Sequence, residues 1–392
     1  MIPATFALLL SLQAADKNPP MDQPAIDAAV ARGIEWLKKA GSPSFARPED
    51  GWHVPDSDEL ILWTFVHAGV PETDPRFKEL LKKMTAAPLG RTYKAALQAM
   101  ILEELDRKSW QRRIATCGQF IVDNQARNGQ WGYGEPLAGA PVAGTPTGGS
   151  GDRAAVRSIG GKEGGPRVKP AVSSRIRITA TRQVGESGDN SNSQYAALGI
   201  RACEEAGVDI PQSVVTLARN WWVNTAVKEG DPKAVVTGPG GPSAGWGYRI
   251  NDGAEPYGSM TAGATGAVAI YDHLMGRDWK KDPIVQGGMA WLAKNYSVTE
   301  NPGGKVHFGS GGRQAAHYYY LYALERAGIL TQNPLLGNHD WYFDGARFLL
   351  GAQEADGSWK KETNGENPVW STCFAILFLK KATQPLVASV DR

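Results

Sequence analysis

The chain has 392 residues, of which 42% are hydrophobic and 21% are charged, and its formal net charge is +2. This length suffices for two average domains or one large closed architecture, and the composition suits a globular protein with a sizeable core. A net charge so close to zero gives no whole-molecule argument for nucleic acid, so no nucleic-acid partner is expected.

Residues 1–15 contain an apolar core from Phe6 to Leu12, followed by the small residues Ala14 and Ala15. This order resembles a short secretory signal peptide, although Lys or Arg is missing before the apolar core. We therefore expect an exported protein, secreted or periplasmic; the alternative is a start without fixed structure. No later segment has the roughly 18 uninterrupted apolar residues of a membrane-spanning helix.

A two-helix pattern recurs from residue 24 to residue 388 and predicts one repeat domain. In each unit, the first helix carries an aromatic and a large apolar residue, and a turn with glycine and an aromatic residue follows. The second helix is apolar on nearly every face, which favours burial on both sides. Apolar positions recur every three or four residues without sustained alternation, so six helix pairs and an all-α fold are predicted. The second helices are expected at 58–70, 92–105, 192–208, 261–275, 314–329 and 371–382.

One turn sequence occurs twice, more than two hundred residues apart. Residues 120–134 read FIVDNQARNGQWGYG, and residues 345–359 read GARFLLGAQEADGSW. A Gln side-chain amide can donate to the unpaired carbonyls at a helix end, Gly permits a tight reversal, and Trp buries a large ring. The recurrence predicts a fastener between repeats and not a catalytic motif.

The frame from Gly345 through Gln353 to Trp359 resembles the QW motif of the squalene cyclase, terpenoid cyclase and protein prenyltransferase superfamily. Two near-complete copies and four degenerate ones extend the resemblance over residues 25–385. The resemblance implies an α/α toroid, in which an inner ring of helices surrounds a lumen and an outer ring encloses it. The chain is long enough for one toroid.

Residues 137–188 interrupt the repeat with a Gly-, Pro-, Ala- and Ser-rich stretch that has no apolar period. Between Asp152 and Arg182 this insertion contains eight Lys or Arg residues and two acids. Such a segment is either a functional loop that contacts an anionic surface or a solvated mobile loop.

Acidic residues open the first inner helix in the sequence PDSDEL. Class II terpenoid cyclases carry Asp-x-Asp-Asp at the mouth of an inner helix, where a buried carboxylic acid protonates an alkene. Asp56, Asp58 and Glu59 resemble that motif, with Glu in place of the last Asp, and the resemblance makes them candidate catalytic acids. The competing interpretation is a capping box, with Asp56 as the N-cap and Glu59 three residues later.

Polar and aromatic residues near the starts of inner helices are candidates to line the lumen. His317 is a further catalytic candidate, because its imidazole and the phenols of HYYYLY lie on adjacent faces. Such a wall can hold a cation, an isoprenoid or a sugar ring, but the same residues can be ordinary core aromatics. The candidate ligand-binding residues are Trp52, Arg91, Tyr93, Asn192, Tyr195, Tyr318 and Trp370.

No metal or cofactor site is expected. Prenyltransferases hold zinc with an Asp and a Cys one residue apart and a later His, and this chain has no Asp-x-Cys. The Asp-Asp-x-x-Asp motif of class I terpene synthases is also missing. Cys117, Cys203 and Cys373 are odd in number and widely spaced, so buried free thiols are predicted.

Three functional hypotheses follow. The first is an exported single toroid that binds an apolar or extended, small-molecule or lipid-like ligand in its lumen, with or without reacting it as a cyclase-like isomerase or transferase. The second is a carbohydrate-active toroid, a polysaccharide lyase or hydrolase, which needs paired carboxylates or a base facing one cleft. The third is a non-catalytic binding or scaffold protein. A fold does not fix a function, so all three stay open.

Overall fold

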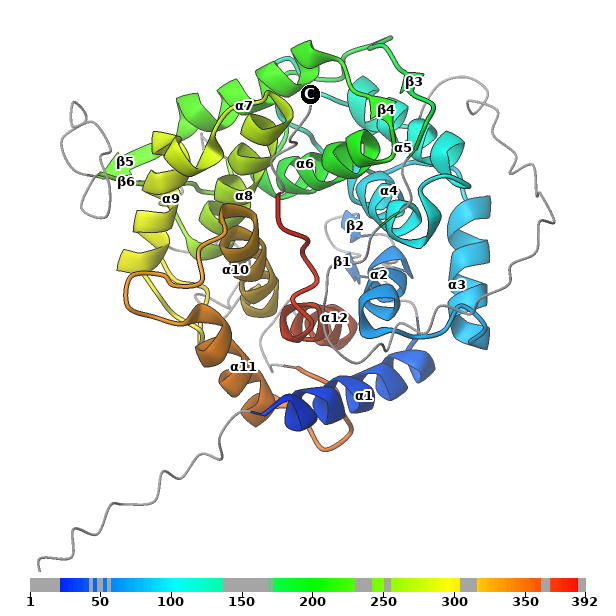
Figure 1. The fold of residues 1–392 in the computed structure, drawn as a ribbon, viewed down its shortest axis with the longest axis vertical. Helices are drawn as coiled ribbons and strands as arrows, with labels where there is room; N and C mark the ends of the chain where they lie inside the picture. The colour runs from blue at the N-terminus through cyan, green and yellow to red at the C-terminus, as the bar shows by residue number, and fades with distance from the viewer. Residues whose placement is uncertain are drawn as a thin grey trace, which may run out of the picture.

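The computed structural model describes residues 22–41, 45–47, 52–54, 58–136, 169, 172–229, 242–249, 255–303, 316–360 and 367–386. Twelve α-helices within these residues alternate between two concentric rings, which Figure 1 shows along the axis. The outer ring is α1 (Gln23–Lys39), α3 (Pro75–Ala86), α5 (Gln111–Asp123), α7 (Gln212–Thr225), α9 (Pro283–Lys294) and α11 (Trp341–Ala352). The inner ring is α2 (Asp58–Ala68), α4 (Thr92–Asp106), α6 (Asn190–Glu205), α8 (Gly258–Leu274), α10 (His317–Thr331) and α12 (Pro368–Leu379). The predicted all-α toroid of six helix pairs is confirmed.

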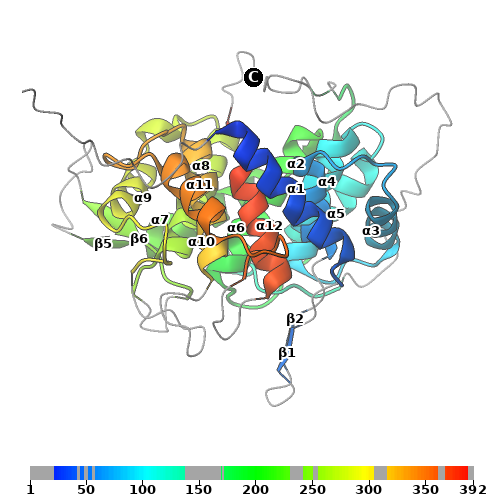
Figure 2. The same ribbon diagram turned by 90° about the horizontal axis from the view of Figure 1, so that it is seen from below.

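The described strands are short, lie in the connections between helices and do not form a separate layer. The antiparallel pairs are β1 (Phe45–Arg47) with β2 (Trp52–Val54) and β5 (Val227–Glu229) with β6 (Ser243–Gly245), and the parallel pair is β3 (Ile176–Arg177) with β4 (Val208–Asp209). Figure 2 shows β1 and β2 projecting from the end of the toroid at which α2 begins. We call this end, where all inner helices begin, the mouth.

The two rings differ in how their helices are buried. Outer helix α3 begins after the N-cap Asp74 and buries Phe77, Leu80 and Met84, which lie three and four residues apart on one face. Inner helix α8 is buried continuously from Gly258 to Asp272. This contrast follows from the sequence, because a helix apolar all round needs neighbours on every side.

Three tryptophans fasten the outer helices to the inner ring in the same way. Each indole N–H donates to a carbonyl in the last turn of the preceding outer helix, and each backbone N–H donates to a Ser or Thr hydroxyl of the next inner helix. The indole bonds are Trp131 to Ile121 (2.7 Å), Trp246 to Trp222 (3.0 Å) and Trp359 to Leu349 (2.9 Å), and the backbone bonds reach Ser193, Thr261 and Thr372. In these turns the indole N–H, and not the Gln side-chain amide, therefore hydrogen-bonds a carbonyl group at the end of the outer helix.

The Gln amides instead join neighbouring outer helices. Nε2 of Gln125 donates to the Val214 carbonyl of α7 at 3.0 Å, and Nε2 of Gln353 donates to the Ala29 carbonyl of α1 at 2.8 Å. The second bond links the last outer helix to the first, so it helps to close the ring.

The segment after α12 crosses the inner ring at the end opposite the mouth, as the red trace in Figure 1 shows. At this far end the inner helices stop, and Lys381 turns the chain with a φ of +46°. Leu386 is 1% exposed and Ala382 is 2% exposed, so both ends of the segment pack into the toroid, whereas Pro385 between them is exposed.

The described part of the insertion also lies against the toroid. The backbone N–H and the hydroxyl of Thr181 both donate to the Asp123 carboxylate at 2.7 Å, at the end of α5. Lys169 pairs with Glu103 at 2.6 Å, and Arg175 pairs with Glu204 at 3.1 Å. These basic side chains therefore meet acids of the same chain.

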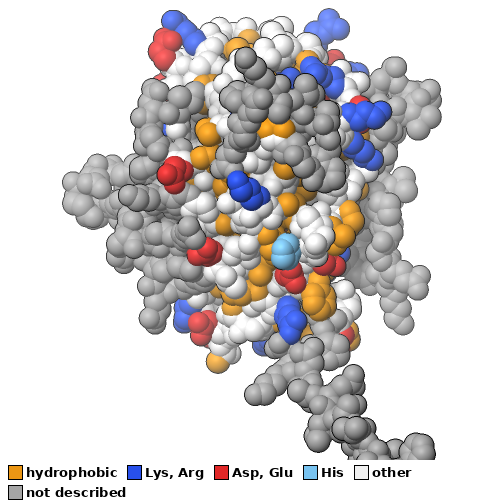
Figure 3. Space-filling model, turned by 90° about the vertical axis from the view of Figure 1, so that its left-hand side faces the viewer, with side chains coloured by type: hydrophobic (Ala, Val, Ile, Leu, Met, Phe, Trp, Pro, Cys, Tyr) orange, Lys and Arg blue, Asp and Glu red, His pale blue; other side chains and the backbone are white. Residues whose placement is uncertain are grey.

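The described residues also show the surface charge, the state of the cysteines and the absence of a membrane-spanning helix among them. The face around α9 in Figure 3 carries Lys and Arg side chains interspersed with Asp and Glu, so neither sign of charge dominates there. The three cysteines are buried free thiols, as predicted, and burial raises the pKa of Cys117 and of Cys373 to about 12. Within the described residues, no helix has the length and apolarity needed to cross a membrane.

Candidate functional site

A continuous row of hydroxyl groups lies at the mouth. The Tyr319 and Tyr93 hydroxyl oxygens are 3.2 Å apart, and Ser191 hydrogen-bonds the hydroxyls of both Tyr93 and Tyr248. Tyr248 in turn hydrogen-bonds Tyr133. We call these five residues the hydroxyl row. Because they come from α10, α4, α6 and two connections, the toroid itself brings them together.

Asp189 anchors the row from below. It is the N-cap of α6 and 1% exposed, and its carboxylate accepts from the Ser191 hydroxyl at 2.6 Å. The backbone N–H and the Nδ2 of Asn192 each donate to the same carboxylate at 2.8 Å. Asn192, predicted to bind ligand, is therefore fully buried and orients Asp189.

The phenols of the row are neutral at ordinary pH. Burial is the main cause that raises the pKa of Tyr93 and of Tyr319 well above the usual range, and neighbouring phenols and Asp189 act in the same direction. Burial raises the pKa of Tyr248 as well. A neutral phenol both donates and accepts hydrogen bonds, but it is a poor general base. The row is therefore suited to binding hydroxyl-bearing ligands and not to proton abstraction.

Aromatic rings from four inner helices meet beneath the row. The Tyr195 ring centroid lies 4.4 Å from that of Tyr93 and 6.2 Å from that of Tyr319, and the Tyr319 centroid lies 5.4 Å from that of Phe374. We call these four residues the aromatic floor. Trp370 lies one helical turn before Phe374 on α12 and is half-buried. These ring contacts join α4, α6, α10 and α12 across the lumen.

A resident cation lies below the floor. Arg326 is 2% exposed, and its guanidinium carbon lies 4.3 Å from the Tyr322 ring centroid and 5.3 Å from that of Tyr195. Its Nη2 donates to Oε1 of Gln194 at 2.7 Å. Such a desolvated cation–π contact contributes about 2 kcal/mol. Arg326 thus supplies the positive charge that this aromatic environment stabilises.

The cavities beside these side chains are small. One of about 10 Å³ lies between α6, α8 and α10 beside Gln194 and Arg326, and another of about 50 Å³ lies at the far end. A cavity of roughly 10–15 Å³ holds one water, whereas pockets for drug-sized ligands measure about 300–1,000 Å³. Each of these two cavities therefore has room for a few waters but not for a polycyclic molecule.

The carboxylates of Asp58 and Glu59 lie between the two rings. Asp58 is 3% exposed and pairs with Lys83 of outer helix α3. Glu59 lies 3.6 Å from the Lys94 ammonium and accepts from Gln98 at 3.3 Å. Alkene protonation needs a protonated carboxyl that faces its substrate, and each of these faces a lysine. Their catalytic role stays a prediction, and Asp56 lies outside the described residues.

The other candidates separate into two groups. Nε2 of His317 lies 3.0 Å from the Val298 carbonyl oxygen, and its ring centroid lies 5.1 Å from that of Phe348 on outer helix α11, so His317 faces the outer ring. Tyr318 is buried beside it. Arg91 lies at the mouth, with its guanidinium carbon 6.0 Å from the Tyr133 ring centroid. The structure thus gathers Arg91, Tyr93, Asn192 and Tyr195 and leaves Asp58, Glu59 and His317 apart; the side chain of Trp52 lies outside the described part.

Several residues of the mouth and the lumen were not singled out from the sequence. Tyr133 and Tyr248 end the same tripeptide, Trp-Gly-Tyr, at residues 131–133 and 246–248, and this repetition was the available signal. Asp189 precedes the helix start as a standard N-cap residue. Arg326 lies in the middle of an apolar inner helix, where a charge requires a reason. The described residues include no group of three or more His, Cys, Asp or Glu placed to hold a metal ion.

Comparisons with known proteins show the fold. No protein-family model and no curated protein matches the chain. A variant of the type II terpene cyclase MstE from Scytonema, in complex with its substrate geranylgeranyl dihydroxybenzoate, is similar with a TM-score of 0.50 and 12% identity over 92% of this chain and 97% of that one.

A possible member of the GH105 family from Salmonella enterica serovar Paratyphi A is similar with a TM-score of 0.50 and 9% identity, over 96% of this chain and 98% of that one. The chain therefore has a terpenoid cyclase-like α/α toroid fold, which confirms the fold that the QW resemblance implied. At these identities the likeness concerns the fold alone.

Proposed function

We propose that this protein is a binding toroid that holds an extended, carboxylate-bearing oligosaccharide across its mouth. The observation that carries the proposal is the hydroxyl row, set among half-buried aromatic rings at the mouth. The proposal keeps the extended ligand of the first sequence-based hypothesis. It differs in placing that ligand at the mouth and in identifying it as a saccharide.

The chemistry of the row matches that of a sugar. A pyranose ring has an apolar face that packs on aromatic side chains and a rim of hydroxyls that donate and accept hydrogen bonds. Tyr93, Tyr319 and Trp370 each keep part of their surface exposed, and the neutral hydroxyls of the row supply both donors and acceptors. An extended chain suits a site that lies across several helix ends.

Charge favours an acidic sugar. Arg91 lies beside Tyr133, and the exposed Arg249 has its guanidinium carbon 5.5 Å from the Tyr248 ring centroid. Among the described acids near the row, Asp189 is buried and already accepts three hydrogen bonds, whereas Glu135, two residues after Tyr133, is exposed. Guanidinium groups bind carboxylates bidentately, so two of them beside the row favour a uronate-type chain over a neutral one.

The side chains that lie in the lumen favour binding at the mouth over ring closure inside. The MstE complex holds a geranylgeranyl dihydroxybenzoate, whereas the described lumen here contains the aromatic floor, Arg326 and cavities of about 10 and 50 Å³. A possible member of the GH105 family has a similar fold, which supports a saccharide ligand. An exported location, proposed from residues 1–15, agrees with a polysaccharide ligand outside the cell.

Calorimetric titration of the full chain tests this proposal. An oligogalacturonate should bind saturably with a micromolar Kd, a cello-oligosaccharide of equal length should bind at least tenfold more weakly, and a geranylgeranyl amphiphile should not compete. Combining Arg91→Met with Arg249→Met should weaken oligogalacturonate binding at least tenfold and reduce its salt dependence. Tyr319→Phe, which removes one hydroxyl of the row, should weaken binding severalfold.

Tyr342→Phe is the matched control. Tyr342 is a half-buried phenol of outer helix α11 whose hydroxyl donates to the Leu379 carbonyl at 2.8 Å, away from the mouth, so its variant should bind normally. Saturable binding of the isoprenoid but of neither saccharide would reject the proposal. Oligogalacturonate binding that the two arginine substitutions leave unchanged would reject it as well.

A further inference from the structure

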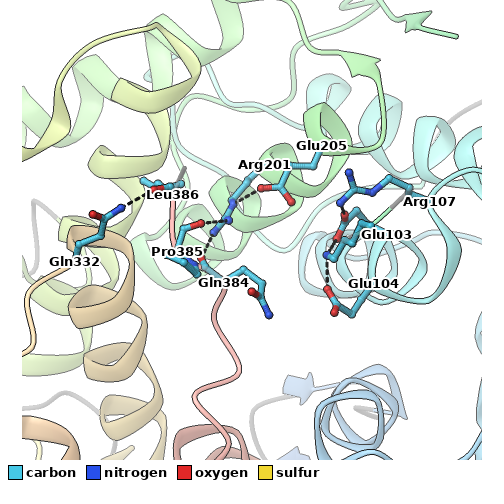
Figure 4. A network of polar contacts seen from close by, with 10 residues as sticks. Glu103, Glu104, Arg107, Arg201, Glu205, Gln332, Gln384, Pro385 and Leu386 are labelled. Carbon is cyan, nitrogen blue, oxygen red and sulfur yellow. Dashed lines mark hydrogen bonds and ion pairs between the residues drawn. The ribbon is translucent and has the colours of Figure 1, made fainter. Parts of the chain in front are cut away.

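The chain that follows α12 runs through the far end of the lumen as an extended peptide. We call residues 382–386 the tail segment; it begins directly after Lys381, which turns the chain with a φ of +46°. Figure 4 shows its carbonyls meeting side chains from α6 and from the end of α10. Because no secondary structure holds it, side-chain contacts fix its path.

Most of these contacts go to the backbone of the tail segment. Nη1 and Nη2 of Arg201 donate to the carbonyls of Gln384 and Pro385 at 2.7 and 3.1 Å, and Nε2 of Gln332 donates to the Leu386 carbonyl at 2.6 Å. The backbone N–H of Thr383 donates to Glu325 at 3.0 Å, and its hydroxyl donates at 2.6 Å. Contacts to main-chain atoms recognise an extended peptide largely independently of its sequence.

The receiving side chains are held in place by the toroid. Nε of Arg201 bonds Glu205 one turn later at 2.7 Å, which leaves its two terminal nitrogens aimed at the tail. Glu325 is fully buried on α10, and Gln332 caps that helix with a φ of +58°. A receptor whose side chains are ordered in advance loses less entropy when it binds a ligand.

The far end also requires an occupant. Without a peptide, Glu325 would lose both hydrogen bonds from Thr383, and Arg201 would lose two acceptors, in a region where unpaired charges are costly. Beside Thr383 and Gln384 a cavity of about 50 Å³ remains, lined on its other side by Glu103 and Lys169. The tail segment therefore fills the site incompletely, and a peptide with larger side chains has room there.

We propose that the far end of the lumen is a binding site for an extended polypeptide segment, occupied in this chain by its own residues 382–386. An external peptide with the same order of polar, polar, proline and aliphatic residues binds there when the tail segment leaves. The attached segment competes at an effective concentration of about millimolar, so the intact chain masks the site.

A full-length chain with a displaced tail tests this proposal. Thr383→Pro removes the N–H and the hydroxyl that Glu325 accepts, and Leu386→Asp adds a charge to a buried position. The probe is a fluorescent peptide with the sequence of residues 380–389, measured by anisotropy. The doubly substituted chain should bind it with a micromolar Kd, and the unaltered chain should bind it at least tenfold more weakly.

Adding Arg201→Met to the displaced-tail chain should weaken peptide binding at least tenfold. Arg127→Met, which removes an exposed arginine paired with Glu186, is the matched control and should not change binding. Equal binding by the displaced-tail and unaltered chains, or equal binding with and without Arg201→Met, would overturn the proposal.

Hydrogen exchange provides a second test if the displaced-tail chain does not fold. In the otherwise unaltered chain, Arg201→Met should speed exchange of the Thr383, Gln384 and Leu386 amides at least tenfold, while the amides of α8 keep their protection. Unchanged exchange in the tail segment would show that these contacts do not hold it, and the proposal would then be wrong.

Discussion

Replacing Gly357 with Ala should weaken the seam that joins the last repeat to the first. Gly357 has a φ of +93°, and a Cβ added there would lie 2.7 Å from the Arg32 carbonyl oxygen of α1. The neighbouring Gln353 donates across the same seam to the Ala29 carbonyl at 2.8 Å and within its own turn to the Gly357 carbonyl at 2.9 Å. Because that obstacle is backbone, it cannot rotate away as a side chain can.

The expected loss can be assembled from these contacts. A left-handed backbone conformation costs a residue with a Cβ about 1–2 kcal/mol. Moving the turn away from α1 weakens two hydrogen bonds of Gln353, each worth about 1 kcal/mol. Gly357→Ala should therefore lower the free energy of unfolding by about 3–4 kcal/mol, which is a large fraction of ordinary protein stability.

Gly351→Ala is the matched control in the same repeat. Gly351 lies exposed within α11 with no atom within 4 Å of an added Cβ, so Ala should raise stability by up to about 1 kcal/mol through its higher helix propensity. Guanidinium chloride unfolding followed by circular dichroism measures both variants. The reasoning is refuted if Gly357→Ala stays within 1 kcal/mol of the unaltered chain, or if Gly351→Ala destabilises as much.

Two further predictions concern buried carboxyl groups. Burial raises the pKa of Glu325 to about 7. Between about pH 4.5 and 7 the folded state therefore binds more protons than the unfolded state. The contribution of Glu325 to the free energy of unfolding then falls as pH rises, by ~1.4 kcal/mol per pH unit at most. Glu325→Gln should lack this slope in denaturant unfolding at successive pH values, and parallel curves for the two chains would contradict the assignment. Asp58→Asn should lower stability by about 1 kcal/mol, as Lys83→Met should, because both break one ion pair. Saccharide binding in calorimetry should stay unchanged, and its loss in Asp58→Asn alone would show that Asp58 serves the site.

The helix pairs could be predicted because their signals are local. The second helices expected at 58–70 and 92–105 correspond to α2 (Asp58–Ala68) and α4 (Thr92–Asp106), where apolar residues occupy every face. The Gln–Gly–Trp spacing likewise marks a turn whose contacts lie within one repeat and the next outer helix. A periodic chain that buries both faces of alternate helices has few ways to pack other than a ring.

The site depended on contacts that no local signal contains. Tyr319 meets Tyr93 although 226 residues separate them, because α10 and α4 face each other across the ring. Asp58 opens an inner helix as expected, yet the rotation of α2 turns its carboxylate toward Lys83 of the outer ring. Sequence period shows that an inner helix is buried on all sides, but it does not show which side faces the lumen.

The amino-acid sequence by itself thus determined the toroid, its repeat boundaries and its tryptophan fasteners. Only the tertiary structure decided that aromatic rings and Arg326 meet in the lumen, that Tyr133 and Tyr248 join one hydroxyl row, and that the tail segment occupies the far end. The physical reason is that helix period and turn chemistry act over a few residues. The contents of the lumen depend instead on the radius of the ring and on the rotation of each inner helix, which all six repeats set together.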